Sequence, residues 1–191
     1  MTVAIVVFPP TAGGNHLRNL ISLSRNYSDN FDDLIYQQKN TVHTYPGRNL
    51  KKEQFTNILI GNNDHLLHGH FGEIMSYQHQ IREIENKKFI VICTDTDQDR
   101  QLLKKRKITN GYSPFDNQDY FFGEQVFLYE PFMYHHYFNV PMTDIMNIPI
   151  TEWFVENINP VLARINYFLQ IDIDIDKAAE LHKIWYTNNF I

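Results

Sequence analysis

One stretch near the start of this 191-residue chain, Val3–Leu23, constrains the fold more than any other. It reads VAIVVFPPTAGGNHLRNLISL. An apolar run of strand-forming residues, Val3–Phe8, precedes two prolines and a turn that contains Gly13 and Gly14. Residues at the spacing of one helix face follow: Leu17, Leu20, Ile21 and Ser24. The pattern predicts a buried strand, a glycine turn and a helix.

This order of elements has two interpretations. A strand, a glycine-containing turn and a helix form a phosphate-binding loop when the N–H groups of the first helical turn point at an anion, and here Asn15 or Thr11 can add a side-chain donor. A plain strand-to-helix turn uses glycine for its backbone geometry alone. An ATP-type loop needs Lys and Ser or Thr after its last glycine, whereas Asn15 and His16 follow Gly14. An ordinary ATPase or kinase is therefore disfavoured.

The segment Pro9–Leu17, PPTAGGNHL, resembles the 5′-phosphosulfate loop of the P-loop sulfotransferases. Bacterial and Golgi members of that family often read Pro-Lys-Thr-Ala-Gly-Thr-Thr-x-Leu, and some place Gly-Asn-His after the loop. Pro10 replaces the usual lysine, which in that family contacts the phosphosulfate. The resemblance implies that the donor 3′-phosphoadenosine 5′-phosphosulfate (PAPS) is bound by Thr11, Ala12, Gly13, Gly14, Asn15 and His16.

A second motif lies in the histidine-rich segment His65–His70, HLLHGH. On a strand His68 and His70 face the same side, so a metal site is conceivable, and so are structural or surface histidines. Gly69-His70-Phe71-Gly72 is similar to a Gly-His-Phe segment of several sulfotransferases, in which the histidine is the catalytic base. The resemblance makes His70 the catalytic candidate, since histidine titrates near neutrality and can take a proton from an acceptor hydroxyl.

The third motif follows the strand FIVIC, at Thr94–Arg100. Sulfotransferases tend to show Arg-Asp-Pro-x-x-Arg there, and its basic residues hold the 3′-phosphate of the donor. Asp95 matches, Arg100 stands one position late, and Thr94 replaces the first arginine. The resemblance implies donor binding by Arg100, which together with Lys104 can make a phosphate site; a solvated helix face is the alternative.

Strand and helix patterns alternate along the first half of the chain, which predicts an α/β fold with a central, mainly parallel sheet flanked by helices. The resemblance to the sulfotransferases implies that this fold is of the three-layer P-loop type. Further strands are expected at His65–His70, Phe89–Cys93 and Met146–Ile150. Helices are expected at Phe31–Gln38, Leu50–Leu59 and Ile74–Ile84, around Leu102 and Leu103 with Asp95 or Asp97 as cap, from Asn159, and through Ala178–Asn188. The aromatic segment Gly123–Phe138 is consistent with a helix or a strand, and a helix is preferred. A surface loop is expected at Ile108–Phe122.

Length and composition predict a single domain over residues 1–191, and the resemblance implies that it is sulfotransferase-like. The net charge of −5 argues against a broad nucleic-acid-binding surface. The one cysteine, Cys93, lies in an apolar run and is expected to be a small core residue. The apolar N-terminal run is too short and lacks the basic flank of a signal peptide, and no stretch has the length of a membrane span. We therefore expect a soluble, cytoplasmic protein with neither nucleic-acid nor membrane partners.

The function hypothesis at this stage is sulfuryl transfer from PAPS to a hydroxyl of a carbohydrate or small molecule, with no metal required. One alternative is a non-catalytic P-loop relative that binds an anion, nucleotide or partner, since Pro10 and Thr94 stand where basic residues are usual. A second alternative is a phosphotransferase of nucleotide-kinase type, which would need magnesium. Arg18 is then the candidate loop cation.

Overall fold

The computed structural model describes residues 2–9, 12–30, 58, 64–94, 96–109 and 131–190. Thr11, the helices expected at 31–38 and 50–59 apart from Ile58, and most of the loop expected at 108–122 lie outside these ranges. In the described residues four parallel strands form one sheet in the order β2-β1-β3-β4. The strands are β1 Val3–Val7, β2 His65–Gly69, β3 Lys87–Cys93 and β4 Ile145–Pro149.

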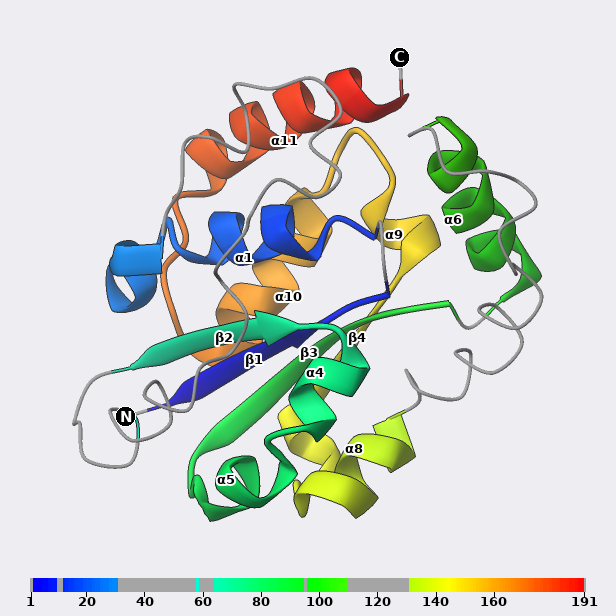
Figure 1. Ribbon diagram of the computed structural model, residues 1–191. Coiled ribbons are helices and arrows are strands. Elements are labelled where there is room, and N and C mark those ends of the chain that lie inside the picture. The colour runs from blue at the N-terminus through cyan, green and yellow to red at the C-terminus, as the bar shows by residue number, and fades with distance from the viewer. Residues whose placement is uncertain are drawn as a thin grey trace.

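Helices cover both faces of this sheet, which confirms the predicted three-layer α/β architecture (Figure 1). One face packs against α1 Gly14–Ile21, α6 Asp97–Thr109, α9 Ile150–Trp153, α10 Asn159–Leu169 and α11 Ile175–Phe190. The other packs against α4 Phe71–Met75, α5 Gln78–Glu83 and α8 Pro131–Phe138. Short 3-10 turns, η1 Arg25–Asn30 and η3 Met142–Asp144, follow α1 and α8.

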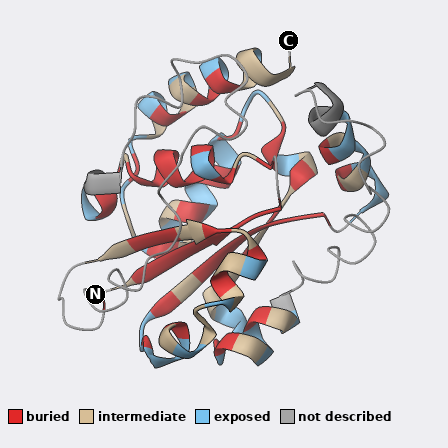
Figure 2. Cartoon of the chain, in the orientation of Figure 1, coloured by how far each residue is buried: buried red, intermediate tan, exposed pale blue. Residues whose placement is uncertain are grey.

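The central strand β1 is buried along its whole length because it lies between two other strands and between two helical layers (Figure 2). Ala4 and Val6 point to the face that carries α1, whereas Val3, Ile5 and Val7 point to the face that carries α8. A parallel strand buried on both faces reads as a continuous apolar run. That burial explains the unbroken VAIVV sequence.

The single helix expected at Ile74–Ile84 is two short helices, α4 and α5, and the prediction was wrong on this point. Tyr77, with φ −114° and ψ 24°, interrupts the helical backbone between them. Lys87 caps the C-terminal end of α5 from outside the helix. It is the first residue of β3, and its Nζ donates to the carbonyl oxygens of Arg82 and Ile84 at 3.3 and 2.7 Å.

The cap expected for α6 was also assigned to the wrong residue. Thr96 precedes the helix, its backbone N donates to Asp99 Oδ2 at 2.9 Å, and the backbone N of Asp99 donates to Thr96 Oγ1 at 3.1 Å. This reciprocal pair is a capping box with aspartate at its third helical position. Asp97 lies inside the first turn of α6 instead.

The C-terminal half follows its prediction closely. β4 ends at Pro149, whose missing N–H suits an edge strand, and α10 begins at Asn159 with Pro160 in its first turn. Asp174 Oδ1 accepts a bond from the N–H of Lys177 at 3.0 Å and so caps α11. Residues 131–138 of the segment expected to be helical form α8.

Candidate functional site

The three sequence motifs meet at one edge of the sheet. Parallel strands end at the same edge, and Val7 pairs with Gly69 of β2 and with Val91 of β3. The chain leaves β1 toward β2 and then crosses to β3 on the other side, so the strand order reverses at β1. Ligands of open α/β sheets bind outside the carboxyl ends of the strands at such a reversal. The first loop, His70 and the Thr94–Arg100 segment all begin there.

The loop after β1 reaches α1 through a tight turn and a left-handed residue. The N–H of Ala12 donates to the carbonyl of Pro9 at 3.1 Å. Gly13 has φ 78° and ψ 24°, a conformation that glycine adopts without the strain a side chain would add. Its carbonyl accepts the N–H of Leu17 at 3.0 Å, so Gly13 is the N-cap of α1. The conformation alone therefore favours glycine at position 13.

Gly14 is needed for a different reason, the ring of Phe8. A Cβ added to Gly14 would lie 1.9 Å from Phe8 Cδ1 and 2.0 Å from Phe8 Cγ. The ring is buried and belongs to the core on the α1 face of the sheet. In a helix the Cα–Cβ bonds tilt toward the N-terminus. The Phe8 ring, which a Cβ at Gly14 would contact, therefore lies beside the N-terminal end of α1.

Gly13 at the N-cap position has no side chain, so this position supplies no side-chain cap to the first turn of α1. The N–H groups of a first helical turn have no acceptor within their own helix, and they favour an anion. Asn15 is exposed at this end of α1. The turn therefore offers backbone donors and one accessible amide side chain.

His16 turns away from this opening into the core. Its Nε2 lies 3.1 Å from Nδ1 of His182 on α11, and its ring stacks on Trp185 at 4.4 Å between centroids. The ring of Trp153 is 5.5 Å away. The side chain thus joins α1 to α11, and only the backbone of His16 belongs to the first helical turn.

His70 lies directly beside the loop. Its Nδ1 lies 2.9 Å from the carbonyl oxygen of Phe8. Because a carbonyl can only accept, Nδ1 carries the proton and donates it, and in the neutral ring the free lone pair is then on Nε2. The backbone N of His70 donates to Glu73 Oε2 at 2.9 Å. The ring is partly exposed and meets the Phe8 ring edge-on at 4.9 Å between centroids. This arrangement fixes the ring and one tautomer.

The strand expected at His65–His70 ends at Gly69, and His70 is the N-cap of α4. His68 and His70 both contact the ring of Phe8, and His68 stacks on it with centroids 6.4 Å apart. Within the residues that the structure describes, no three His, Cys, Asp or Glu side chains are grouped so that they could hold a metal ion. Cys93, at the end of β3, is buried in the core.

Arg100 reaches the same edge from α6. Its guanidinium pairs with Asp97 and lies 3.5 Å from the carbonyl oxygen of Thr94. Lys104, one turn further along α6, is exposed. The Arg100 side chain is therefore held close to the end of β3 but is partly neutralised by Asp97.

Two residues that brace this edge were missed by the sequence reasoning. Trp153 Nε1 donates to the carbonyl of Ala12 at 2.8 Å and holds the loop from α9. Asp99 is fully buried, and besides its bonds to Thr96 it accepts the N–H of Thr151 at 2.7 Å. The Thr96-x-x-Asp99 spacing was a readable capping signal. Nothing local in the sequence pairs Trp153 with a residue 141 positions away.

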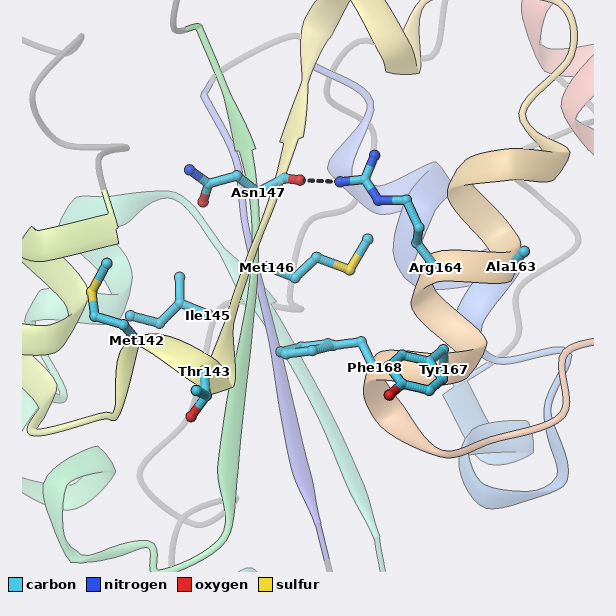
Figure 3. A pocket seen from close by; sticks show the side chains of 9 residues that line it. All are labelled: Met142, Thr143, Ile145, Met146, Asn147, Ala163, Arg164, Tyr167 and Phe168. Carbon is cyan, nitrogen blue, oxygen red and sulfur yellow. Dashed lines mark hydrogen bonds between the residues drawn. The ribbon is translucent and has the colours of Figure 1, made fainter.

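A groove elsewhere on the molecule contains none of the predicted site residues. It runs along the first half of the edge strand β4 and the facing side of α10 (Figure 3). Arg164 Nη2 donates to the backbone oxygen of Asn147 at 2.8 Å, and Arg164 also pairs with Glu152. A charged side chain that binds a backbone carbonyl of an edge strand hinders the addition of a strand from another chain.

No helix among the described residues is long and apolar enough to cross a membrane. Comparison of the chain with models of protein families, with curated proteins and with solved structures found no match.

Proposed function

We propose that this protein transfers a sulfuryl group from PAPS to a hydroxyl of a carbohydrate or small molecule. The loop Thr11–His16 and the first turn of α1 hold the phosphosulfate, Arg100 contacts the 3′-phosphate, and His70 is the base. The observation that carries the proposal is the bond from His70 Nδ1 to the carbonyl of Phe8, which ties the base candidate to the donor loop and leaves its Nε2 lone pair available.

The proposed reaction requires one proton acceptor and one leaving group. The acceptor oxygen forms a bond to sulfur while the bond between sulfur and the bridging phosphate oxygen breaks. The hydroxyl proton passes to His70 Nε2, and 3′-phosphoadenosine 5′-phosphate leaves. A positioned histidine typically accelerates such a step by about 10²–10⁴-fold. The reaction needs no metal, and the proposal includes a cytoplasmic location without nucleic-acid or membrane partners.

The fit of the donor rests mainly on backbone groups. The uncapped first turn of α1 offers N–H donors, and Arg100 lies at the neighbouring strand end. Pro10 supplies no cation, and Asp97 shares the charge of Arg100. We therefore expect weaker donor binding than a loop with lysine would provide, because charge-assisted hydrogen bonds are roughly twice as strong as neutral ones.

A second candidate is a binding protein without catalysis. Its supporting observation is that both loop glycines have reasons within the fold, since Gly13 needs its left-handed backbone and Gly14 needs room for Phe8. A strand-to-helix turn that only preserves the fold would keep the same two glycines. A nucleotide-kinase type of transfer is the third candidate and is separated from the others by its need for magnesium.

Calorimetric titration with 3′-phosphoadenosine 5′-phosphate tests the donor site. Two substitutions form a matched pair, Gly13→Asn and Gly13→Asp, because both side chains tolerate the left-handed conformation and differ in charge. We expect binding to the wild type and to Gly13→Asn, and at least a tenfold loss in Gly13→Asp. Absence of binding to the wild type refutes the sulfotransferase proposal. Binding of ATP with magnesium instead supports the kinase type.

Catalysis is tested separately with His70→Asn. The asparagine amide can still donate to the carbonyl of Phe8 but offers no basic nitrogen, so donor binding should persist while transfer to a panel of sugars and phenols falls by at least about 100-fold. His68→Asn is the control, since His68 contacts the same Phe8 ring. Donor binding without transfer in the wild type would favour the non-catalytic candidate.

A further inference from the structure

Two histidines and both tryptophans of the chain form one buried cluster between α1, α9 and α11. His16 comes from α1, Trp153 from α9, and His182 and Trp185 from α11. The ring centroid of His182 lies 5.3 Å from the ring centroids of both His16 and Trp153, and 5.4 Å from that of Trp185. The proposed reaction uses neither histidine side chain.

The hydrogen bonds of this cluster define where the protons lie. His182 Nε2 is 2.7 Å from the carbonyl oxygen of Val155, so this nitrogen carries a proton and donates it. In the neutral ring Nδ1 is then an acceptor, and it receives the Nε2–H of His16 at 3.1 Å. A second proton on His182 would occupy Nδ1, and this hydrogen bond would then be lost unless His16 moved its own proton from Nε2 to Nδ1.

Among the described residues, no charged side chain faces His182 that would compensate a positive charge on its ring. The groups that face its ring are His16 from α1, Trp153 and the Val155 carbonyl from the α9 side, and Trp185 and Tyr186 from α11 itself. Burial lowers the pKa of His182 to about 4, and the Val155 carbonyl opposes that shift only in part. No charged side chain contributes to the shift.

Helix α11 is attached to the rest of the protein by few buried side chains. Ala178, His182 and Trp185 are the buried residues of this 16-residue helix. An element with a small buried face opens more easily than a central strand. An unfavourable charge on His182 therefore acts on one of the three buried side chains that hold α11.

We propose that the His16–His182 pair is an acid-sensitive latch, and that protonation of His182 releases α11 from α1 while the sheet stays folded. The proposal does not depend on the proposed function. Its consequence for the loop is direct, because His16 lies three residues after Gly13 and Trp153 of the same cluster holds the Ala12 carbonyl.

The direction of the effect follows from the pKa values. In the released helix His182 returns to its ordinary pKa of 6.5, whereas in the docked helix the pKa is about 4. The docked state therefore keeps its full stability above pH 6.5 and loses it as the pH falls toward 4. The opening equilibrium should rise about tenfold per pH unit within this window, and by about 300-fold in total.

Native-state hydrogen exchange of the full chain from pH 7.5 to pH 4 tests the proposal, with each rate divided by the intrinsic chemical rate at that pH. We expect the amides of α11 to show the tenfold rise per unit and to exchange faster than those of β1 at every pH. Two non-titrating variants are compared: His182→Gln, which can still donate to Val155, and His182→Phe, which keeps an aromatic ring. The exposed His79→Gln is the control.

The expected result is that the pH-dependent rise disappears in whichever of the two His182 variants folds and persists in His79→Gln. The proposal is overturned if the rise persists in a His182 variant, or if wild-type α11 shows no such rise. It is also overturned if α11 and β1 exchange at the same rate throughout, since the helix would then open only with the whole protein.

Discussion

Replacement of Gly14 by alanine tests directly whether packing determines the residue at the start of α1. The added Cβ would be placed 1.9 Å from Phe8 Cδ1, whereas carbon atoms pack at about 3.5–4.0 Å. The ring has little freedom to move, because it is buried and flanked by His68 and His70. The substitution therefore forces a shift of the ring or of the helix start.

The expected magnitude is the balance of two terms. Overpacking costs about 1–3 kcal/mol, and a contact this short belongs at the upper end of that range. Alanine in place of glycine returns at most about 1 kcal/mol through helix propensity. We therefore expect Gly14→Ala to lower the free energy of unfolding by about 2 kcal/mol. In a Phe8→Ala background the clash is absent, so the same change should be neutral or slightly stabilising.

The assay is urea unfolding of the wild type, both single variants and the double variant, with Gly72→Ala as the matched control. Gly72 is also in the first turn of a helix, and a Cβ there meets no atom within 4 Å. Gly72→Ala should change the free energy of unfolding by less than about 1 kcal/mol. The cycle should give a coupling energy of about 2–3 kcal/mol between positions 8 and 14. Additive effects, or a stable Gly14→Ala, would refute the packing explanation.

Two further substitutions test the supports of the same edge. Asp99→Asn should lower the free energy of unfolding by about 3 kcal/mol, because bonds to a charged group contribute about 1.5–3 kcal/mol and the single amide oxygen cannot accept the bonds from Thr96 and from the N–H of Thr151 together. Thermal unfolding measures this loss, and an unchanged midpoint would contradict the prediction. Trp153→Phe removes the donor to the Ala12 carbonyl and should lower the free energy of unfolding by about 1–2 kcal/mol. Hydrogen exchange in the loop should become faster, and unchanged exchange there would show that the bond does not hold the loop.

The sequence predicted correctly those helices and strands whose signals lie within or directly beside the element itself. The apolar run of β1, the glycine turn and the helix after it are contiguous, and their order follows from periodicity and glycine placement alone. The proline at the start of α10 and the aspartate before α11 are signals of the same kind. The split between α4 and α5 was missed, since apolar residues keep helical spacing across the break at Tyr77.

The candidate site was only partly readable from the sequence. Parallel strands bring the loop, His70 and Arg100 to one edge, and that much follows from the predicted fold. The bond between His70 and the Phe8 carbonyl joins positions 62 residues apart, and no local pattern indicates it. Arg100 was predicted to contact the donor and lies near the end of β3, but its pairing with Asp97 depends on the rotamers of both side chains.

By itself, the sequence determined that strands and helices alternate and that a glycine turn joins the first pair. Only the tertiary structure decided what the side chains at that turn do. His16 lies in the first turn of α1 and His70 directly follows β2, yet His16 packs against a residue 166 positions away while His70 stays partly exposed beside the loop. The physical reason is that periodicity specifies the face of an element, whereas the partner on that face is chosen by contacts between distant segments.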